Sequence, residues 1–393
     1  MIPDVLEPHL PALRAAARAE PLGLYLHVPF CRDRCTYCSF ITTRDVARKP
    51  AALGQLGSHL RGWGALLGRP QVDTLYLGGG TPSLLSSGEL AVLTGTAARA
   101  FDLSTLVEAT LEANPGTVDM PWLARARTLG WDRISLGVQS LDDILLASLG
   151  RIHNGRNALE ALGWARRAGF TRVNADLMVG IPGQLVGRVL EDARTLIQAG
   201  ATHLSVYLLD LDKACPLRAQ VDAGKLTLPS EDEVADMYEA LQVELPKLGL
   251  EPYEISNYAV PGQASRHNTR YWERRPYLGL GPSASSQLGV LRWTESGVIP
   301  AWIEGRGKAD VQELTPAQAL AEIPLLGLRM HQGVDWERLR ALGRSQQLES
   351  LVQTWEGQLA PFLEHGLLVR EGPMVRLTPR GMLVSNGVLQ IFV

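Results

Sequence analysis

The stretch YLHVPFCRDRCTYCSF, residues 25–40, decides how this chain is interpreted. It holds three of the four cysteines of the chain, Cys31, Cys35 and Cys38, on a short loop after a strand-like run. Thiolates at this C-x3-C-x2-C spacing can converge on one soft metal centre, and an iron–sulfur cluster is a natural occupant. A structural zinc site usually takes four ligands. Three cysteines on a 4Fe–4S cluster would instead leave one iron open to a further ligand; a zinc loop is the alternative.

Composition limits the classes of protein and partner. The chain has 393 residues and is 46% hydrophobic, which is enough for one large domain and a smaller one. Its formal charge is 38 − 41 = −3, so nucleic acid is not an expected partner. The N-terminus lacks the basic and apolar regions of a signal peptide, and no apolar run approaches the roughly 18 residues of a membrane helix.

The clustered thiols need a reducing compartment. We therefore expect a cytoplasmic protein without a transmembrane segment. Peripheral membrane contact stays open, and so does the choice between a monomer and a homodimer.

Strand-like and helical patterns alternate along the first two thirds of the chain. Residues 1–20 contain a short N-terminal helix, and strand-like runs follow at residues 24–28, 73–77, 107–112, 133–138, 172–179 and 203–208. Helical patterns lie between them, for example at residues 89–100, 157–168 and 186–198. This order predicts parallel strands joined by helical crossovers, so residues 21–300 should form an α/β sheet or barrel.

One face of most of these strands carries polar residues in strict alternation, which is unusual for a parallel barrel. A polar interior implies a ligand, and barrel enzymes keep their sites at the carboxyl ends of the strands. Solvated positions at an open sheet edge are the alternative. The alternating residues are Tyr25, His27, Glu108, Thr110, Glu112, Ser135, Gln139, Asn174, Asp176, Ser205 and Tyr207.

The C-terminal part, residues 305–393, has a different character. Helical stretches at residues 315–330, 336–343 and 348–365 precede a hairpin at residues 367–370 and 374–377. Helices followed by a small hairpin resemble a winged-helix module, which raises DNA binding as an alternative. Residues 301–393 have one more acidic than basic residue and no basic stripe, so we expect a structural or docking domain.

A second motif, which is rich in glycine, supports the interpretation of the cysteine loop. The sequence LGGGTPS, residues 77–83, follows the second strand, and its glycines would let the backbone approach a ligand and expose N–H groups to it. Together, these two motifs resemble those of the radical S-adenosylmethionine (SAM) family. The resemblance implies a partial (β/α)6 TIM-like barrel, a 4Fe–4S cluster on Cys31, Cys35 and Cys38, and SAM at the open iron.

Other residues match the oxygen-independent coproporphyrinogen oxidase group of that family, in order and on successive strand–helix units. The carboxylate of Glu112 could accept bonds from a ribose, and Arg151 could pair with the SAM carboxylate. The SAM-binding residues that the resemblance implies are Tyr25, Tyr37, Gly79, Gly80, Thr81, Glu112, Gln139, Arg151 and Asp176.

Two departures separate the chain from the oxidases themselves. The oxidase branch has a fourth cysteine two residues after the third, where this chain has Phe40, and it has a longer N-terminal extension. Both departures point to the sister branch, the HemW-type heme chaperones. The sequence HNTRYW, residues 267–272, matches the heme-associated motif of that branch and implies heme binding by His267, Asn268, Tyr271 and Trp272.

The chemistry of this motif suits a porphyrin, because an imidazole can ligate heme iron and aromatic rings can stack on the macrocycle. Arg266 or Arg270 could pair with the propionates. A histidine that only forms hydrogen bonds in a loop is the alternative for His267. Cys215, which precedes a proline, is another possible heme thiolate, although a partly buried free cysteine is favoured.

The resemblance therefore predicts a heme chaperone that binds heme and passes it to an unknown acceptor protein, with an unknown electron donor for its cluster. No catalytic residue is assigned, and we lean against enzyme activity. The first alternative is the oxidative decarboxylation of coproporphyrinogen III by a radical SAM oxidase. The second is another radical SAM reaction on a small metabolite, because a fold does not fix a function.

Overall fold

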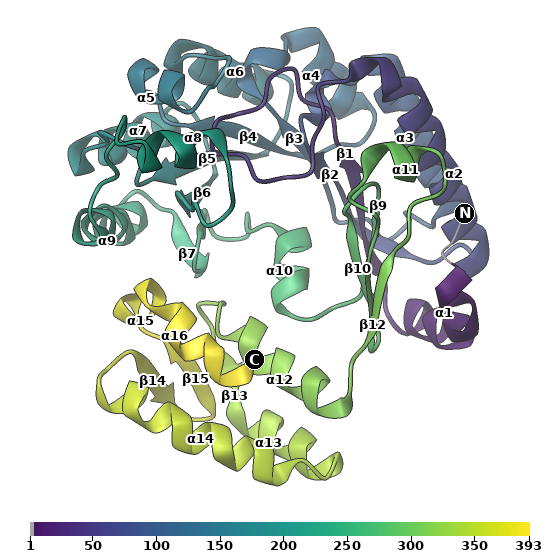
Figure 1. The fold of residues 1–393 in the computed structure, drawn as a ribbon, viewed down its shortest axis with the longest axis vertical. Helices are drawn as coiled ribbons and strands as arrows, with labels where there is room; N and C mark the ends of the chain where they lie inside the picture. The colour runs from purple at the N-terminus through teal and green to yellow at the C-terminus, as the bar shows by residue number, and fades with distance from the viewer. Residues whose placement is uncertain (1–3) are drawn as a thin grey trace.

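The computed structural model describes residues 4–393 and is built around one sheet of twelve strands (Figure 1). Six neighbouring strands run parallel in chain order, as the alternating pattern predicts, and form a partial barrel. They are β1 (Leu22–Val28), β2 (Val72–Gly79), β3 (Glu108–Ala113), β4 (Arg133–Gln139), β5 (Arg172–Val179) and β6 (His203–Leu208).

The helices between these strands cover the outer side of the sheet (Figure 1). They are α2 (Lys49–Leu67), α3 (Ser87–Ala100), α4 (Met120–Thr128), α5 (Asp143–Ser148), α6 (Gly155–Arg167) and α7 (Val186–Gln198). Outward-facing strand residues such as Leu24 and Leu77 are fully buried against them. Each buried leucine stabilises the fold by about 2 kcal/mol. The single-turn segments η2 (Val46–Arg48), η3 (Pro82–Leu84) and η4 (Pro115–Thr117) lie in the connecting loops.

The N-terminal segment packs on the same core. It consists of η1 (Asp4–His9) and α1 (Leu10–Ala19), and the predicted helix is thus partly a 3-10 turn. Leu6 and Leu13 are fully buried in the main hydrophobic cluster. Residues 1–3 of the predicted N-terminal segment lie outside the described residues.

Short strands that the sequence pattern does not predict extend the sheet at both edges. At one edge, β9 (Tyr277–Leu280) pairs parallel with β1, and β10 (Ser285–Leu288), β11 (Leu291–Thr294) and β12 (Asp310–Glu313) continue antiparallel. At the other edge, β8 (Asn257–Ala259) joins β6 and β7 (Glu251–Glu254) completes the sheet. Strands of three or four residues are too short to display a period of two. The main sheet therefore reaches Glu313, beyond the boundary expected near residue 300.

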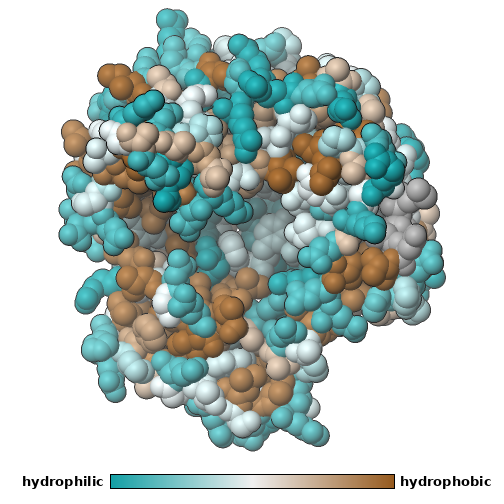
Figure 2. Space-filling model, viewed as in Figure 1, coloured by the Kyte–Doolittle hydropathy of each residue, from teal (hydrophilic) through white to brown (hydrophobic). Residues whose placement is uncertain are grey.

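Four further helices belong to this part of the chain: α8 (Pro216–Asp222), α9 (Glu231–Lys247), α10 (Arg266–Trp272) and α11 (Ile299–Ile303). Helix α10 lies at the centre of Figure 1, between the sheet and the C-terminal helices. The space-filling view is hollowed near this central region (Figure 2).

The C-terminal part contains a second hydrophobic cluster, which includes Trp336, Trp355 and Phe392. Its helices are α12 (Pro316–Gly327), α13 (Trp336–Ser345), α14 (Glu349–Glu364), α15 (Pro379–Leu383) and α16 (Ser385–Leu389), with the terminal turn η5 (Gln390–Phe392). The predicted hairpin is present as β14 (Leu368–Glu371) and β15 (Met374–Leu377), and β13 (Val334–Asp335) pairs with it. The exact domain limits remain a prediction.

The C-terminal part is joined to the barrel part by polar contacts. The Glu322 carboxylate pairs with Arg274 at 2.6 Å and with Arg292 at 2.8 Å. Backbone bonds from Ile255 N to Arg329 O (3.1 Å) and from His331 N to Tyr253 O (2.9 Å) add to this join. Among residues 4–393, no helix is both long and apolar enough to cross a membrane.

Candidate functional site

The polar residues predicted from the strand alternation meet inside the barrel. The Asn174 side-chain nitrogen, which has two hydrogens to donate, lies within hydrogen-bonding distance of Ser135 Oγ (2.7 Å), Asp176 Oδ1 (2.7 Å) and Ser205 Oγ (3.0 Å). One residue of β5 thus connects β4 and β6 across the inner face. Because a buried polar group without a partner costs about 1–3 kcal/mol, this network stabilises an interior that apolar residues would otherwise fill.

The cysteine loop lies at the carboxyl end of β1 and is held by backbone bonds. Cys31 N donates to Thr43 O at 3.0 Å, and Thr36 N donates to Leu149 O at 3.0 Å. The three thiols are half-buried. Burial raises the pKa of Cys31 and of Cys38, and the nearby Cys35 raises both further. The thiolate state of the loop therefore requires positive charge nearby.

Two side chains from other strand–helix units reach these sulfurs. Arg151 Nη1 donates to Cys35 Sγ at 3.3 Å, and Thr81 Oγ1 lies 3.6 Å from Cys31 Sγ. Arg151 also donates to the carbonyl of Gly137, while its buried Nε has no hydrogen-bond partner among the described residues. The guanidinium thus provides positive charge beside the thiols and a free donor for an anionic ligand.

The thiols do not converge on a single point. Among residues 4–393, no three His, Cys, Asp or Glu side chains are placed to hold one metal ion. A zinc site, in which each sulfur lies about 2.3 Å from one ion, is therefore not formed. Thiolates that bind different irons of a cluster need not share a centre, so this soft donor set fits a polynuclear iron–sulfur cluster better than zinc.

The glycine-rich turn after β2 can be built only from glycine. A Cβ on Gly79, which has a φ of +114°, would lie 2.7 Å from the His27 ring, and one on Gly80 would lie 2.7 Å from the Phe30 carbonyl oxygen. The expectation that this turn exposes its N–H groups is wrong. These groups donate within the protein, from Gly79 to Glu112, from Gly80 to Val28 and from Thr81 to Phe30. An amino group of a ligand would need carbonyl acceptors here instead.

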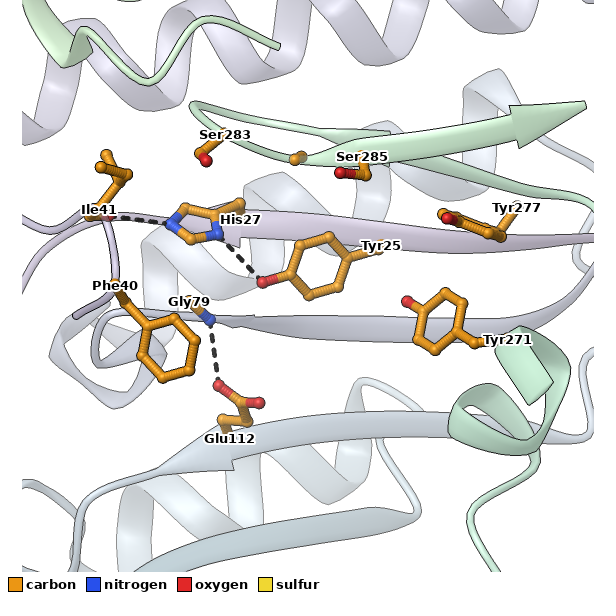
Figure 3. A pocket seen from close by; sticks show the side chains of 11 residues that line it. Tyr25, His27, Phe40, Ile41, Gly79, Glu112, Tyr271, Tyr277, Ser283 and Ser285 are labelled. Carbon is orange, nitrogen blue, oxygen red and sulfur yellow. Dashed lines mark hydrogen bonds between the residues drawn. The ribbon is translucent and has the colours of Figure 1, made fainter. Parts of the chain in front are cut away.

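A cavity of about 410 Å³ opens beside this turn; we call it the barrel cavity (Figure 3). The Tyr25 hydroxyl and His27 Nδ1 form a hydrogen bond of 3.0 Å. The Glu112 carboxylate accepts hydrogen bonds from the Tyr76 hydroxyl at 2.7 Å and from Gly79 N at 3.0 Å. Burial, and then the nearby Asp176 carboxylate, raise the pKa of Glu112 to about 7. The cavity is lined by Tyr25, His27, Phe40, Ile41, Gly79, Glu112, Tyr271, Tyr277 and Ser283 to Ser285.

The other predicted SAM residues lie between the barrel cavity and the cysteine loop. Asp176 acts electrostatically on both Glu112 and Tyr37. Burial raises the pKa of Tyr37, and the charge of Arg151 opposes this shift. Gln139 is buried at the end of β4 with a φ of +72°, where the pairing of β4 with β5 is irregular. The predicted residues thus form one region, with Glu112 on the side of the barrel cavity and Arg151 on the side of the cysteine loop.

Helix α10 carries the HNTRYW motif, and its single histidine, His267, is fully buried. His267 Nδ1 bonds Thr74 Oγ1 at 2.9 Å and His267 Nε2 bonds the Tyr271 hydroxyl at 2.8 Å. Burial, and then Arg270, lower the pKa of His267 to about 3. Both ring nitrogens are thus occupied by hydrogen bonds, and burial favours the neutral imidazole.

The other motif residues face different surroundings. Arg270 is fully buried and bonds Asp73 and the carbonyls of Pro21 and Pro276, so it is not free for a propionate as the sequence suggested. Tyr271 lines the barrel cavity. Trp272 lies beyond it and carries the Arg329 guanidinium 4.5 Å from its ring centre.

The last two residues that the sequence analysis connected with heme are Asn268 and Cys215. Asn268 is half-buried, and its backbone N–H donates to Ser265 Oγ at 3.3 Å. Cys215 is half-buried at the start of α8, where its sulfur accepts from Arg218 N at 3.5 Å, as expected for a free cysteine.

Sequence reasoning missed Arg133, which is 1% exposed inside the barrel. Its Nε and Nη1 have no hydrogen-bond partner among the described residues, and its charge lowers the pKa of both Glu112 and Asp176. At the first position of a strand it resembles an ordinary solvated arginine. Its alternation with Ser135 is the signal that could have identified it.

Comparison with known proteins identifies the class. Residues 25–209 match the family described as the Radical SAM superfamily, and residues 314–384 match the HemN C-terminal domain. The fold is similar to the coproporphyrinogen III oxidase HemN of Escherichia coli, with a TM-score of 0.85 at 21% identity over 98% of this chain and 92% of that one. The fold is therefore that of a HemN-like radical SAM protein.

Curated relatives define the family more closely. The protein named heme chaperone HemW in Mycobacterium tuberculosis is 36% identical over 97% of both chains. HemW of Bacillus subtilis is 33% identical over 94% of this chain and 98% of its own. A mitochondrial radical SAM domain-containing protein 1 of Bos taurus is 33% identical over 95% of this chain and 88% of its own. This chain belongs to the HemW family.

Proposed function

We propose that this protein is a heme chaperone that binds heme and transfers it to an acceptor protein. The observation that carries the proposal is the likeness to proteins named heme chaperone HemW, which extends over 97% of the chain at 36% identity and so includes both parts of the molecule. Phe40 in place of a fourth loop cysteine agrees with the same branch.

The barrel cavity gives a physical reason to favour this proposal over the oxidase alternative. Coproporphyrinogen III carries four propionates, and a site for it needs cationic partners. No lysine or arginine is among the described residues that line the barrel cavity, and Glu112 there adds negative charge or, when protonated, none. A tetra-anionic substrate would bind poorly in such a cavity.

The cluster and SAM would be held by the residues already described. Cys31, Cys35 and Cys38 would ligate three irons, and Arg151, beside Cys35, would offer its unpaired Nε to the SAM carboxylate. The Glu112 carboxylate keeps acceptor capacity for ribose hydroxyls, because each of its oxygens accepts only one hydrogen bond from the described residues. The cluster supplies, when bound, one-electron chemistry at SAM. A regulatory role in heme transfer is as compatible with this arrangement as a catalytic one.

The proposal is tested by anaerobic reconstitution with iron and sulfide followed by two assays. One sample is titrated with heme and followed by absorbance; the other receives coproporphyrinogen III, SAM and a reductant and is assayed for protoporphyrinogen. We expect stoichiometric heme binding without turnover. Turnover with only weak, non-specific heme uptake would identify the oxidase instead.

A pair of cysteine variants tests the cluster separately. Cys35→Ser should abolish the cluster absorbance, whereas the matched control Cys215→Ser should retain it, because Cys215 caps the start of α8, outside the cysteine loop. A full cluster spectrum in Cys35→Ser would contradict the assigned ligands. Cytoplasmic location, the electron donor, the acceptor and the oligomeric state stay predictions.

A further inference from the structure

A second cavity lies between the barrel part and the C-terminal part, on the far side of α10 from the barrel cavity. It measures about 540 Å³, and we call it the interdomain cavity. Cavities of this size accept cofactor-sized molecules. Its walls are the end of α10 and the following loop, α12, β13, α13 and β15, and they are formed by Trp272, Glu273, Arg274, Arg275, Ile323, Gly327, Met330, Gln332 to Asp335, Arg338, Leu339, Leu342 and Met374.

The interdomain cavity combines apolar walls with cationic groups. Trp272, Ile323, Leu339 and Leu342 provide large apolar surfaces. Arg274, Arg275 and Arg338 also line it, together with the carboxylates of Glu273 and Asp335. A flat apolar molecule with two carboxylates would match both properties, because guanidinium groups bind carboxylates in a bidentate manner.

The three arginines differ in how free they are. Arg274 pairs with Glu322 and Arg275 pairs with Glu20 and Asp73, so both are already neutralised in part. Arg338 is exposed on α13 and pairs with no carboxylate among the described residues. It is therefore the guanidinium most free to receive a ligand carboxylate.

The HNTRYW motif reaches this cavity through only one of its aromatic residues. His267 has both ring nitrogens occupied, and Tyr271 faces the barrel cavity, whereas Trp272 lines the interdomain cavity. The Trp272 indole N–H is buried and has no partner among the described residues. The barrel cavity has no lysine or arginine among the described residues of its wall to bind propionates. The two cavities thus offer very different surroundings to a porphyrin.

We propose that the interdomain cavity is the heme site, with the macrocycle against Trp272, a propionate at Arg338 and a methionine thioether on the iron. This inference rests on the proposed function. Histidine, cysteine, tyrosine and methionine are the side chains that ligate heme iron. Of these, only Met330 and Met374 are among the described residues of the cavity wall. The C-terminal part thereby supplies the iron ligand, and the motif supplies a wall.

The test uses three probes on the full-length protein: ferric and ferrous heme, iron-free protoporphyrin IX and its dimethyl ester. Arg338→Glu should weaken protoporphyrin binding about tenfold or more, as expected for the loss of a charge-assisted contact, and should not alter binding of the uncharged ester. Met330→Leu or Met374→Leu should change the heme absorbance bands while leaving protoporphyrin affinity within about twofold. Met382→Leu is the matched control, because Met382 is buried in the C-terminal core away from this cavity.

The outcomes separate this inference from the proposed function. If the wild-type protein binds no heme, the chaperone proposal fails and the heme site fails with it. If the wild type binds heme but Arg338→Glu, Met330→Leu and Met374→Leu all leave affinity and spectrum unchanged, the interdomain site alone is wrong. Loss of porphyrin binding in Tyr277→Phe, a change in the wall of the barrel cavity, with the other variants intact would place the porphyrin there. Because Arg338 is exposed, its variant should fold, which unchanged circular dichroism verifies.

Discussion

Replacing His267 by alanine should destabilise the protein without changing how iron is ligated. The imidazole is 0% exposed, bonds Thr74 and Tyr271 through its two nitrogens, and lies 5.0 Å from the Tyr76 ring, centre to centre. Its backbone N–H also donates to Glu108 at 3.1 Å, a contact that alanine keeps. The substitution therefore removes a buried ring and two hydrogen bonds but leaves the helix start intact.

The expected magnitude follows from these contacts. Thr74 is 1% exposed, and its hydroxyl loses its only hydrogen-bond partner among the described residues, which costs about 1–3 kcal/mol. Tyr271 lines a cavity and can turn to water, so its loss is small, while the space left by the ring adds about 1 kcal/mol. The sum is about 3 kcal/mol. With an unfolding entropy of roughly 2.1 cal/mol/K per residue over 393 residues, this lowers the melting temperature by about 4 °C.

The assay compares His267→Ala with His203→Ala. His203 is the matched control, because it is 1% exposed and also has both nitrogens bonded, to Asn174 at 2.6 Å and to Tyr253 at 2.9 Å, outside the motif. Urea unfolding should show similar losses in both variants, and the heme absorbance bands of each folded variant should match the wild type. Unchanged stability in His267→Ala together with altered heme bands, seen in this variant alone, would refute the reasoning and restore His267 as an iron ligand.

Three further predictions concern charge. Glu112→Gln should stabilise the protein by about 2 kcal/mol at pH 8 and by much less at pH 5. The reason is that burial raises the pKa of Glu112 to about 7, so its ionisation opposes folding as pH rises through that value. Unfolding at the two pH values measures this difference, and the same variant should bind SAM more weakly. Burial lowers the pKa of His203, so the unfolded chain takes up a proton that the folded protein excludes. Stability should fall as pH drops below about 6.5, and His203→Ala should reduce that fall in pH-dependent unfolding. Glu322→Gln breaks the ion pairs with Arg274 and Arg292 at a mostly buried carboxylate, which costs about 3 kcal/mol of stability. Limited proteolysis between residues 305 and 315 should become faster in this variant. An unchanged cleavage rate would mean that these ion pairs do not hold the barrel part and the C-terminal part together.

The sequence predicted those features of the fold that repeat over many residues. All six parallel strands lie where the apolar runs indicate, and β5 and β6 have the predicted bounds. Helix α7 also matches its prediction, because its apolar face repeats at helical spacing. The edge strands β7 to β12 were not predicted. They owe their conformation to pairing with the sheet, a tertiary effect that segments of three or four residues do not display.

The sequence predicted which residues meet in the candidate site better than it predicted the surroundings of the HNTRYW residues. The cysteine loop and the inner-face residues come together because register and strand direction determine their positions. The roles within HNTRYW could not be obtained in this way, since a spacing of four residues places His267 and Tyr271 on one face of α10 but does not say whether that face is buried. The structure buries it against β2 and β3, and the ring nitrogens are consumed there by Thr74 and Tyr271.

The position of α10 explains how this motif can belong to a heme site without ligating iron through its histidine. The buried Glu108 carboxylate accepts from the backbone N–H groups of Arg266 and His267, at 2.9 and 3.1 Å, and so fixes the start of the helix on β3. His267 then holds Tyr271 at the wall of the barrel cavity, and the next residue, Trp272, necessarily turns to the interdomain cavity. A seven-residue helix anchored by two buried groups thus separates the region proposed for SAM from the cavity proposed for heme. Because the helix forms a wall of both cavities, displacement of α10 by a ligand on one side must alter the other side, and any resulting coupling of the two affinities is reciprocal.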